Sequence, residues 1–360
     1  MPNNQLKNLI KINAAFADAA RSHYATIGLT YVEVPLIVGI TGACENVDTL
    51  FRVGSRLGVP LFFSQTGQLS LEQALQYFPG VYTVIHSGRD EETEDDRHLR
   101  QFRLTEEEFD WTLAGMQGEA YDEEKMYEAL LAHIEGATKA IAATILKQHG
   151  GMIDQAYGQR SQAVLESLAL PYLRISYEDA LALLAKNGFP DLRWGDDLKT
   201  EHEARVVKLL NGDSFPRPVF IMRYPKDIKF FNMKVSQKDE RVVLSTDLVF
   251  PCAGEGVGAA VREHDGDRLT QRLVGSTMFR LHRERGGTLE DFDWYLNLVQ
   301  SGNTRPHAGY GIGNERLIQY LIGQKDIRNC SVFHLMAEQT HDWEPAIRAD
   351  SALKEPAYAN

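Results

Sequence analysis

The segment HSGRDEETEDDRHLRQFRLTEEEF, residues 86–109, decides how the rest of the sequence is interpreted. Arginines stand at positions 89, 97, 100 and 103, among many carboxylates. A solvated loop needs no such ordered mixture of cations and acids. The question is therefore which negatively charged group these arginines bind.

The chain has 360 residues, of which 43% are hydrophobic and 24% are charged. This favours one large or two ordinary globular domains with an ample core. The three cysteines, Cys44, Cys252 and Cys330, lack the spacing of metal ligands, so we expect neither a disulfide framework nor a zinc site. The net charge of -12 disfavours a broad nucleic-acid surface, although a local basic groove is compatible with it.

The N-terminal segment lacks the apolar core of a signal peptide, and the sequence contains no apolar run of about eighteen residues. These observations predict a soluble, cytoplasmic protein that does not enter a membrane.

Apolar periodicity predicts a helix over residues 5–27 and a second over 122–149, which Gly150 and Gly151 would end. Residues 30–38, TYVEVPLIV, predict an edge or interface strand that contains a proline. Residues 176–188 begin with a capping-box pattern and close on a glycine, so they predict a further helix.

Two apolar segments, 218–224 and 242–250, predict strands, and Asp247 is the lone acid in the second. A carboxylate in a strand is costly unless a cation or a donor meets it. Asp247 is therefore expected either to form a structural ion pair, which the strand alone favours, or to bind a metal ion.

The segment AGEGVGAAVRE, residues 253–263, places three alternating glycines around Glu255 and ahead of Arg262. It is not the dinucleotide-binding pattern, because the third glycine comes one residue early and no βαβ pattern surrounds it. Glycine alternation on a strand permits the close approach of a ligand, and a bulged strand without a ligand explains it equally well.

In PHAGYGIGNERLIQYLIG, residues 306–323, a glycine-rich strand leads into a helix near Asn314, with Arg316 in its first turn. A cation there opposes the helix dipole, so Arg316 is expected to face an anion. Phosphate and a neighbouring carboxylate are both candidates.

Together these segments resemble the three signature motifs of class II aminoacyl-tRNA synthetases, most closely the catalytic domain of asparaginyl-tRNA synthetases. GLTYVEVPLI (28–37) is similar to motif 1, and GYGIGNERL (309–317) is similar to motif 3. ACENVDTLF, TGQLSLE, WGDDLKTEHE, YPKDIKFF and RPHAG follow in family order, so the resemblance covers residues 5–330. The family pattern of motif 2 is matched by Arg89, Glu91, Arg97, His98, Leu99 and Phe102.

The resemblance implies an α+β fold, in which helices flank a mostly antiparallel sheet. The catalytic domain would cover residues 1–335, with a helical elaboration at 112–215 and a C-terminal tail at 336–360. The motif 1 resemblance implies a homodimer with Pro35 near its interface.

The resemblance also implies that ATP and Mg²⁺ are bound, because an attack on the α-phosphate by a carboxylate needs fixed cations and metal ions. Arg89 would hold the α-phosphate and the attacking carboxylate, and Arg316 the γ-phosphate. Asp247 and Glu255 would hold magnesium, which prefers oxygen ligands. The residues implied to contact ATP are Arg89, Glu91, Arg97, His98, Leu99, Phe102 and Arg316, with Phe102 stacked on adenine.

For the amino acid, the resemblance implies that Glu45 and Gln68 meet the ammonium group and Arg262 the side-chain carbonyl. Aspartyl-type enzymes have a lysine at the position of Leu71. The pocket is thus similar to an asparaginyl one, while Arg262 remains able to meet an acid or an amide.

The sequence departs from the family at the N-terminus, where the anticodon-binding barrel is expected to be absent, and at Val299 and Gln300, Asn314 and residues 332–343. These departures favour adenylation over aminoacylation of tRNA. The leading hypothesis is an AMP-forming asparagine synthetase that acts on aspartate, ATP and ammonia without tRNA. The alternatives are adenylation of an asparagine- or aspartate-like amino acid with transfer to another amine or carrier in a biosynthetic pathway, and a non-catalytic regulatory protein that binds an amino acid or nucleotide.

Overall fold

The computed structural model describes residues 3–40, 49–91, 95–302 and 304–333. Its strands are β1 (Thr30–Tyr31), β2 (Ile37–Val38), β3 (Arg52–Val53), β4 (Leu61–Phe63), β5 (Gly80–Gly88), β6 (Gln101–Asp110), β7 (Leu173–Ser176), β8 (Val219–Met222), β9 (Ser245–Phe250), β10 (Gly254–Val261) and β11 (His307–Gly313). Its α-helices are α1 (Asn3–Thr26), α2 (Gln68–Ala74), α3 (Glu123–Tyr157), α4 (Ser161–Leu168), α5 (Tyr177–Ala185), α6 (Thr200–Asn211), α7 (Gly266–Val274), α8 (Thr277–Glu284), α9 (Asp293–Gln300) and α10 (Asn314–Ile322). Short 3₁₀ turns are η2 (Lys226–Ile228), η3 (Leu289–Phe292) and η4 (Ile327–Cys330).

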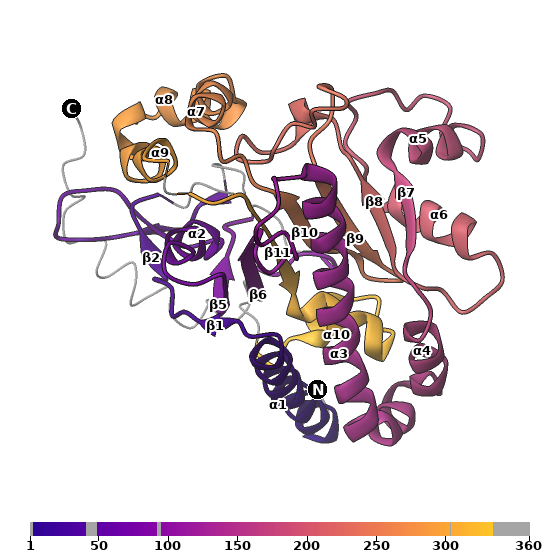
Figure 1. Cartoon of the computed structure of the whole chain (residues 1–360). Helices are drawn as coiled ribbons and strands as arrows, with labels where there is room; N and C mark the ends of the chain where they lie inside the picture. The colour runs from indigo at the N-terminus through magenta and orange to yellow at the C-terminus, as the bar shows by residue number, and fades with distance from the viewer. Residues whose placement is uncertain (1–2, 41–48, 92–94, 303, 334–360) are drawn as a thin grey trace.

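A central sheet organises the molecule (Figure 1). Its eight strands follow the order β1-β5-β6-β11-β10-β9-β8-β7, and a smaller sheet joins β2, β4 and β3. All neighbours in the large sheet are antiparallel except the outer pairs β1 with β5 and β7 with β8. The predicted α+β fold with a mostly antiparallel sheet is therefore confirmed.

One face of the large sheet is covered by α1 and α3, and α10 joins the same core (Figure 1). Leu130 and Ile134 of α3 pack in one hydrophobic cluster with Phe109 of β6 and Leu248 of β9. Helix α3 is long and apolar enough to cross a membrane by length and composition, but half of its most apolar window is buried inside the protein. It has the character of a core helix.

The predicted end of the helix at Gly150 and Gly151 is wrong, because α3 continues to Tyr157. Gly150 is buried, and an added Cβ there would lie 3.1 Å from the hydroxyl of Ser161, the first residue of α4. The glycine thus lets α4 approach α3 closely, and tertiary packing overrides its low helix propensity.

The segment 30–38 is not one strand, because it forms only the two-residue strands β1 and β2. Pro35 lies between them, and β1 is an edge of the large sheet, as a proline-containing segment favours. The expected helix after Ser176 is α5, and the Ser176 side chain accepts a hydrogen bond from the amide of Asp179.

Residues 112–215 supply α3, α4, α5 and α6, together with β7, which is the other edge of the large sheet. Asn314, which starts α10, is buried and accepts a hydrogen bond of 2.8 Å from the Thr105 hydroxyl of β6. This contact explains why a polar residue is tolerated there.

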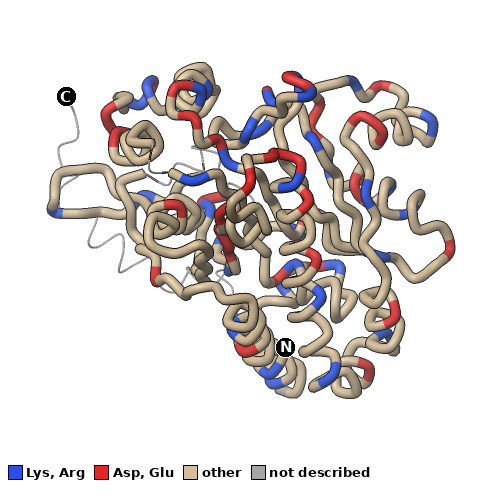
Figure 2. The backbone as a smooth tube through the Cα atoms, viewed as in Figure 1, with Lys and Arg blue, Asp and Glu red and all other residues tan. Residues whose placement is uncertain are grey.

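The opposite face of the sheet carries acidic side chains in the interior of the molecule, where Figure 2 shows a run of acids at β6. Helices α7, α8 and α9 lie at one end of this face, and α5 and α6 lie beyond β8 and β7 (Figure 1). The uncovered middle of this face is where the candidate site lies.

Candidate active site

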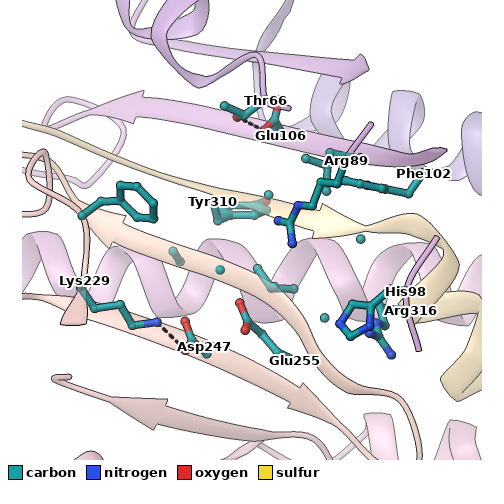
Figure 3. Close-up of a pocket in the computed structure, with 18 of the residues that line it drawn as sticks. Thr66, Arg89, His98, Phe102, Glu106, Lys229, Asp247, Glu255, Tyr310 and Arg316 are labelled. Atoms are coloured by element: carbon teal, nitrogen blue, oxygen red, sulfur yellow. Dashed lines mark hydrogen bonds and ion pairs between the residues drawn. The ribbon is translucent and has the colours of Figure 1, made fainter. Parts of the chain in front are cut away.

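A cavity of about 760 Å³ opens on the face of the sheet opposite α3. Figure 3 shows that its labelled side chains come from several strands and converge on the same space. Glu45, the remaining predicted residue, lies outside the described part of the chain. The predicted site residues that line the cavity are Gln68, Arg89, Glu91, Arg97, His98, Leu99, Phe102, Asp247, Glu255, Arg262 and Arg316.

Arg89 and Phe102 form one wall of the cavity. Arg89 follows β5, and its amide donates a hydrogen bond of 2.9 Å to the carbonyl of Arg100 across the turn. Its guanidinium carbon lies 5.4 Å from the centroid of the Phe102 ring in β6. A cation held over an aromatic face is therefore fixed in place before any anion arrives.

His98 is held by Asp95, an acid of the segment that opened the sequence analysis. The carboxylate of Asp95 lies 2.9 Å from His98 Nδ1 and accepts the amides of Arg97 and His98. Burial acts in the opposite direction, but these hydrogen bonds hold the pKa of Asp95 below its usual range. Asp95 thus orients the histidine at the cavity mouth.

Within the described part of the chain, the Arg316 guanidinium donates hydrogen bonds to carbonyl groups rather than to a carboxylate. Its guanidinium donates to the carbonyl of Ala253 at 2.5 Å and to that of Arg97 at 2.6 Å. Burial and the nearby Arg97 guanidinium lower the pKa of Arg316, although Glu255 and Glu203 oppose this effect. Two guanidinium groups this close favour an anion between or beside them.

Asp247 and Glu255 present carboxylates to the cavity from β9 and β10. Lys229 Nζ lies 2.7 Å from Asp247 Oδ2, so the ion pair that the strand pattern favoured is present. Despite burial, Asp247 and Glu255 raise the pKa of Lys229. The two carboxylates are the hard oxygen donors that magnesium prefers, so the donor set fits that ion.

Glu203 of α6 also belongs to this group, and motif analysis did not single it out. Its Oε2 accepts the amide of Glu255 at 3.1 Å, and burial together with the charge of Asp247 raises its pKa to about 7. The signal was its place at the end of WGDDLKTEHE, one of the segments in family order.

β10 contains a bulge between Glu255 and Val257. A bulged strand was one of the two explanations that the sequence left open for the alternating glycines. A Cβ on Gly256 would lie 2.2 Å from the ring of Phe250, so this glycine serves packing. Gly256 and Gly258 both line the cavity, and an added Cβ on Gly258 would lie 3.3 Å from Glu255 Oε1. Both explanations of the glycines, a bulged strand and room for a ligand, thus apply to this strand.

Arg262 is fully engaged at the other end of the cavity. It forms an ion pair of 2.6 Å with Glu108 of β6, and both side chains are buried. Burial raises the pKa of Glu108 to about 7, against the attraction of Arg262. Arg262 is therefore already neutralised by a protein carboxylate.

A second buried pair adjoins the first. Glu72 of α2 accepts hydrogen bonds of 2.8 Å from Gln68 and from Tyr295, and it lies 3.2 Å from His307 Nε2. Although burial opposes both shifts, the pair lowers the pKa of Glu72 and raises that of His307. Glu72, Glu108 and His307 were not predicted from the sequence, since their roles depend on contacts across the fold.

The consecutive acids of β6 now divide by face, as strand alternation requires. The Glu106 carboxylate accepts the amide of Gly67 at 2.6 Å and the Thr66 hydroxyl on the cavity side. Glu107 points to the other face and lies 2.6 Å from His133 Nδ1.

Leu71, at the position of the aspartyl-type lysine, is fully buried in a hydrophobic cluster with Val34, Leu75 and Val81. It contributes no charge to the cavity. Two cationic groups, Arg262 and His307, thus face the carboxylates of Glu72 and Glu108, and these four charges balance, while Glu106 adds one more acid on the cavity side.

An antiparallel sheet that carries fixed arginines at one end of a cavity and a polar pocket with paired charges at the other defines a class II synthetase catalytic domain. The family described as tRNA synthetases class II (D, K and N) matches residues 1–337. The chain belongs to this family.

Individual proteins to which the chain is similar support this family membership. The chain is 31% identical to an asparagine–tRNA ligase of Thermococcus kodakarensis over 326 residues, which is 90% of this chain and 68% of that one. It is 30% identical to an asparagine–tRNA ligase of Desulfitobacterium hafniense, over 92% of this chain and 70% of that one. The asparaginyl-tRNA synthetase of Pyrococcus horikoshii complexed with asparaginyl-adenylate superimposes with a TM-score of 0.79 at 29% identity, over 92% and 69% of the two chains.

Proposed function

We propose that the chain is an ATP-dependent, AMP-forming ligase that activates aspartate, or a close analogue, as an acyl adenylate. The acyl group then passes to an amine without tRNA, and with ammonia as the amine the product of aspartate is asparagine. The observation that carries the proposal is the convergence of eleven predicted site residues on one cavity, with arginines at one end and the Arg262 network at the other.

In the first step, a carboxylate oxygen of the amino acid attacks the α-phosphate of ATP, and pyrophosphate leaves. Arg89 offsets the charge of the α-phosphate and of the attacking carboxylate, while Arg97 and Arg316 offset that of the remaining phosphates. Asp247 and Glu255 would hold magnesium, which supplies further positive charge at the phosphates when bound. Glu255 supports this role because it is exposed to the cavity.

In the second step, the amine nitrogen attacks the acyl carbon and the bond from that carbon to the phosphate oxygen breaks. AMP leaves with the electron pair, and the amine loses a proton. Fixed geometry favours this step because both reactants are then held in one place.

Asparagine is a second candidate for the activated amino acid, because Arg262 is already paired with Glu108. A second carboxylate, that of aspartate, would add negative charge to a pocket end whose cations are already matched by carboxylates. The neutral amide of asparagine avoids that cost. The related Pyrococcus structure holds asparaginyl-adenylate, which is consistent with this candidate.

A homodimer is part of the proposal. In segment 30–38, Tyr31, Leu36 and Ile37 are 52%, 44% and 51% exposed, which is apolar surface that a second copy of the chain would cover. Light scattering at micromolar concentration is expected to give twice the mass of the chain, and a monomer would refute this part.

The decisive experiment is ATP–pyrophosphate exchange with each of the twenty amino acids, without tRNA. Exchange is expected with aspartate or with asparagine, and its absence with both would refute the proposed activation. Aspartate, ATP, Mg²⁺ and ammonium are then expected to yield asparagine and AMP. If no amide forms and total tRNA is charged instead, the tRNA-free part of the proposal is wrong.

A further inference from the structure

A second cavity, of about 670 Å³, lies beside the first. Residues 226–231 and Val235 form one side of it, and the junction of α7 with α8 forms the other. Residues 226–231 belong to YPKDIKFF, one of the segments in family order, but the sequence did not indicate a cavity there, because its two sides come from segments some forty residues apart. The side chains used below are Lys226, Asp227, Lys229, Arg272, Met278 and Leu281.

The two cavities adjoin along segment 228–230, because Ile228, Lys229 and Phe230 line both of them. Lys229 contacts Asp247 on the side of the first cavity, and Figure 3 shows this pair at the end opposite His98 and Arg316. A ligand in the second cavity would therefore lie beside the first site, away from its nucleotide end.

Residues 230–233 connect the second cavity with the amino-acid end of the first. Met233, which lines the first cavity, forms a backbone bridge with Arg262. The Arg272 guanidinium of α7 donates to the carbonyls of Phe231 at 2.9 Å and Phe230 at 2.8 Å. These contacts fix the segment that lies where the two cavities meet.

The charge of the second cavity is positive in a chain whose net charge is -12. Among the residues that the structure describes, Lys226, Lys229 and Arg272 line it against one acid, Asp227. Lys229 is engaged by Asp247, so the charge that can attract an anion is that of Lys226 and of Arg272, whose guanidinium also donates to three carbonyls. Among the described residues, the hydrogen bonds of the Arg272 guanidinium go to carbonyls and not to carboxylates.

Apolar side chains complete the cavity. Val235, Met278 and Leu281 line it together with Phe230 and Phe231. Cationic groups beside an apolar surface suit a small molecule with a carboxylate and a hydrocarbon body. Ammonia has neither feature and needs no cavity of this size.

We infer that the second cavity binds the acyl acceptor, and that this acceptor is an amine that carries a carboxylate, such as an amino acid. The inference rests on the proposed adenylation. The acceptor nitrogen forms the new bond to the acyl carbon as the bond from that carbon to the phosphate oxygen breaks. AMP leaves with the electron pair, and the proton of the amine goes to solvent.

The test offers the full chain ATP, Mg²⁺ and whichever amino acid supports exchange, together with a panel of acceptors. The panel is the twenty amino acids, the amines that lack their carboxylates, and ammonium. At least one amino acid is expected to consume the adenylate at least tenfold more efficiently than its matched amine and than ammonium. If ammonium or the decarboxylated amines are the better acceptors throughout, the inference is wrong.

Two variants test whether the second cavity binds the acceptor. Lys226→Glu reverses a charge and Leu281→Trp fills the apolar side, and each is expected to raise the KM of the acceptor at least tenfold. Lys147→Glu makes the same charge change on the exposed surface of α3 and is expected to leave that KM unchanged. An acceptor KM that does not respond to either cavity variant would overturn the inference.

Pyrophosphate exchange separates the two proposals, because it reports only the first step. If pyrophosphate exchange persists but the acceptor KM is unchanged in the cavity variants, the acceptor site is refuted and the proposed adenylation stands. Loss of all exchange in the unaltered chain refutes the proposed function itself.

Discussion

The buried pair of Arg262 and Glu108 offers the sharpest test of how the cavity chooses between an acid and an amide. Glu108→Gln removes a carboxylate that lies 2.6 Å from the Arg262 guanidinium and keeps the size of the side chain. The variant leaves Arg262 with an uncompensated charge at the amino-acid end. The kcat/KM for aspartate is therefore expected to rise relative to that for asparagine.

The expected rise in this ratio can be calculated from the charge that the substitution removes. Two unit charges about 4 Å apart interact by ~1 kcal/mol in water and ~4 kcal/mol at an effective dielectric constant of about 20. The ratio of kcat/KM for aspartate over asparagine is thus expected to rise by roughly fivefold to several hundredfold. The assay is pyrophosphate exchange with both amino acids, and their ratio cancels any loss of folded protein.

The effect depends on pH with a definite sign. Burial raises the pKa of Glu108 to about 7, so a larger fraction of its carboxylate is charged at pH 8 than at pH 6. Glu108→Gln is expected to change the ratio more at pH 8 than at pH 6. The matched control is Glu107→Gln, which alters a buried acid on the opposite face of the same strand. An unchanged ratio in Glu108→Gln at pH 8, or an equal change in Glu107→Gln, would refute the reasoning.

Three further predictions concern the nucleotide end and the sheet. Arg316→Ala is expected to lower pyrophosphate exchange at least about 100-fold, because one preorganised cation is lost, and a near-normal rate would rule out a role at the phosphates. Glu255→Gln is expected to raise the Mg²⁺ concentration for half-maximal exchange by about tenfold or more, and an unchanged Mg²⁺ titration would argue against metal binding there. Gly256→Ala is expected to lower the free energy of unfolding by about 1–3 kcal/mol in urea titrations, because its Cβ would lie 2.2 Å from the ring of Phe250. Gly54→Ala, where an added Cβ meets no atom within 4 Å, is the matched control and is expected to stay within about 0.5 kcal/mol of the unaltered chain.

The residues that we propose to contact ligands could be located from the sequence, because the order and spacing of their motifs resemble those of a known family. Arg89, Phe102 and Arg316 line the cavity as the motif resemblance implied. The helix around Gly150 could not be predicted correctly, because glycine usually ends a helix and here it admits α4.

Residues whose partners are other protein groups were missed for a physical reason. Glu72, Glu108 and His307 come from α2, β6 and β11, and only the fold shows that their charges meet. Side chains in a strand alternate between the two faces of the sheet, so three consecutive glutamates in a strand indicate that at least one of them faces the interior. This pattern does not say which face each takes or which cation it meets.

The two ends of the cavity differ in how their charge is compensated, and this difference has consequences for specificity. At the proposed nucleotide end, Arg316 donates to the carbonyls of Ala253 and Arg97, and burial together with the nearby charge of Arg97 lowers its pKa. At the amino-acid end, Arg262 is matched within the protein by Glu108. Substrate phosphates can therefore stabilise the first end, while a single charge change at the second end alters which side chain is accepted. Activation chemistry and side-chain choice are thus separable by substitution, which is why the aspartate-to-asparagine ratio can change while the exchange reaction continues.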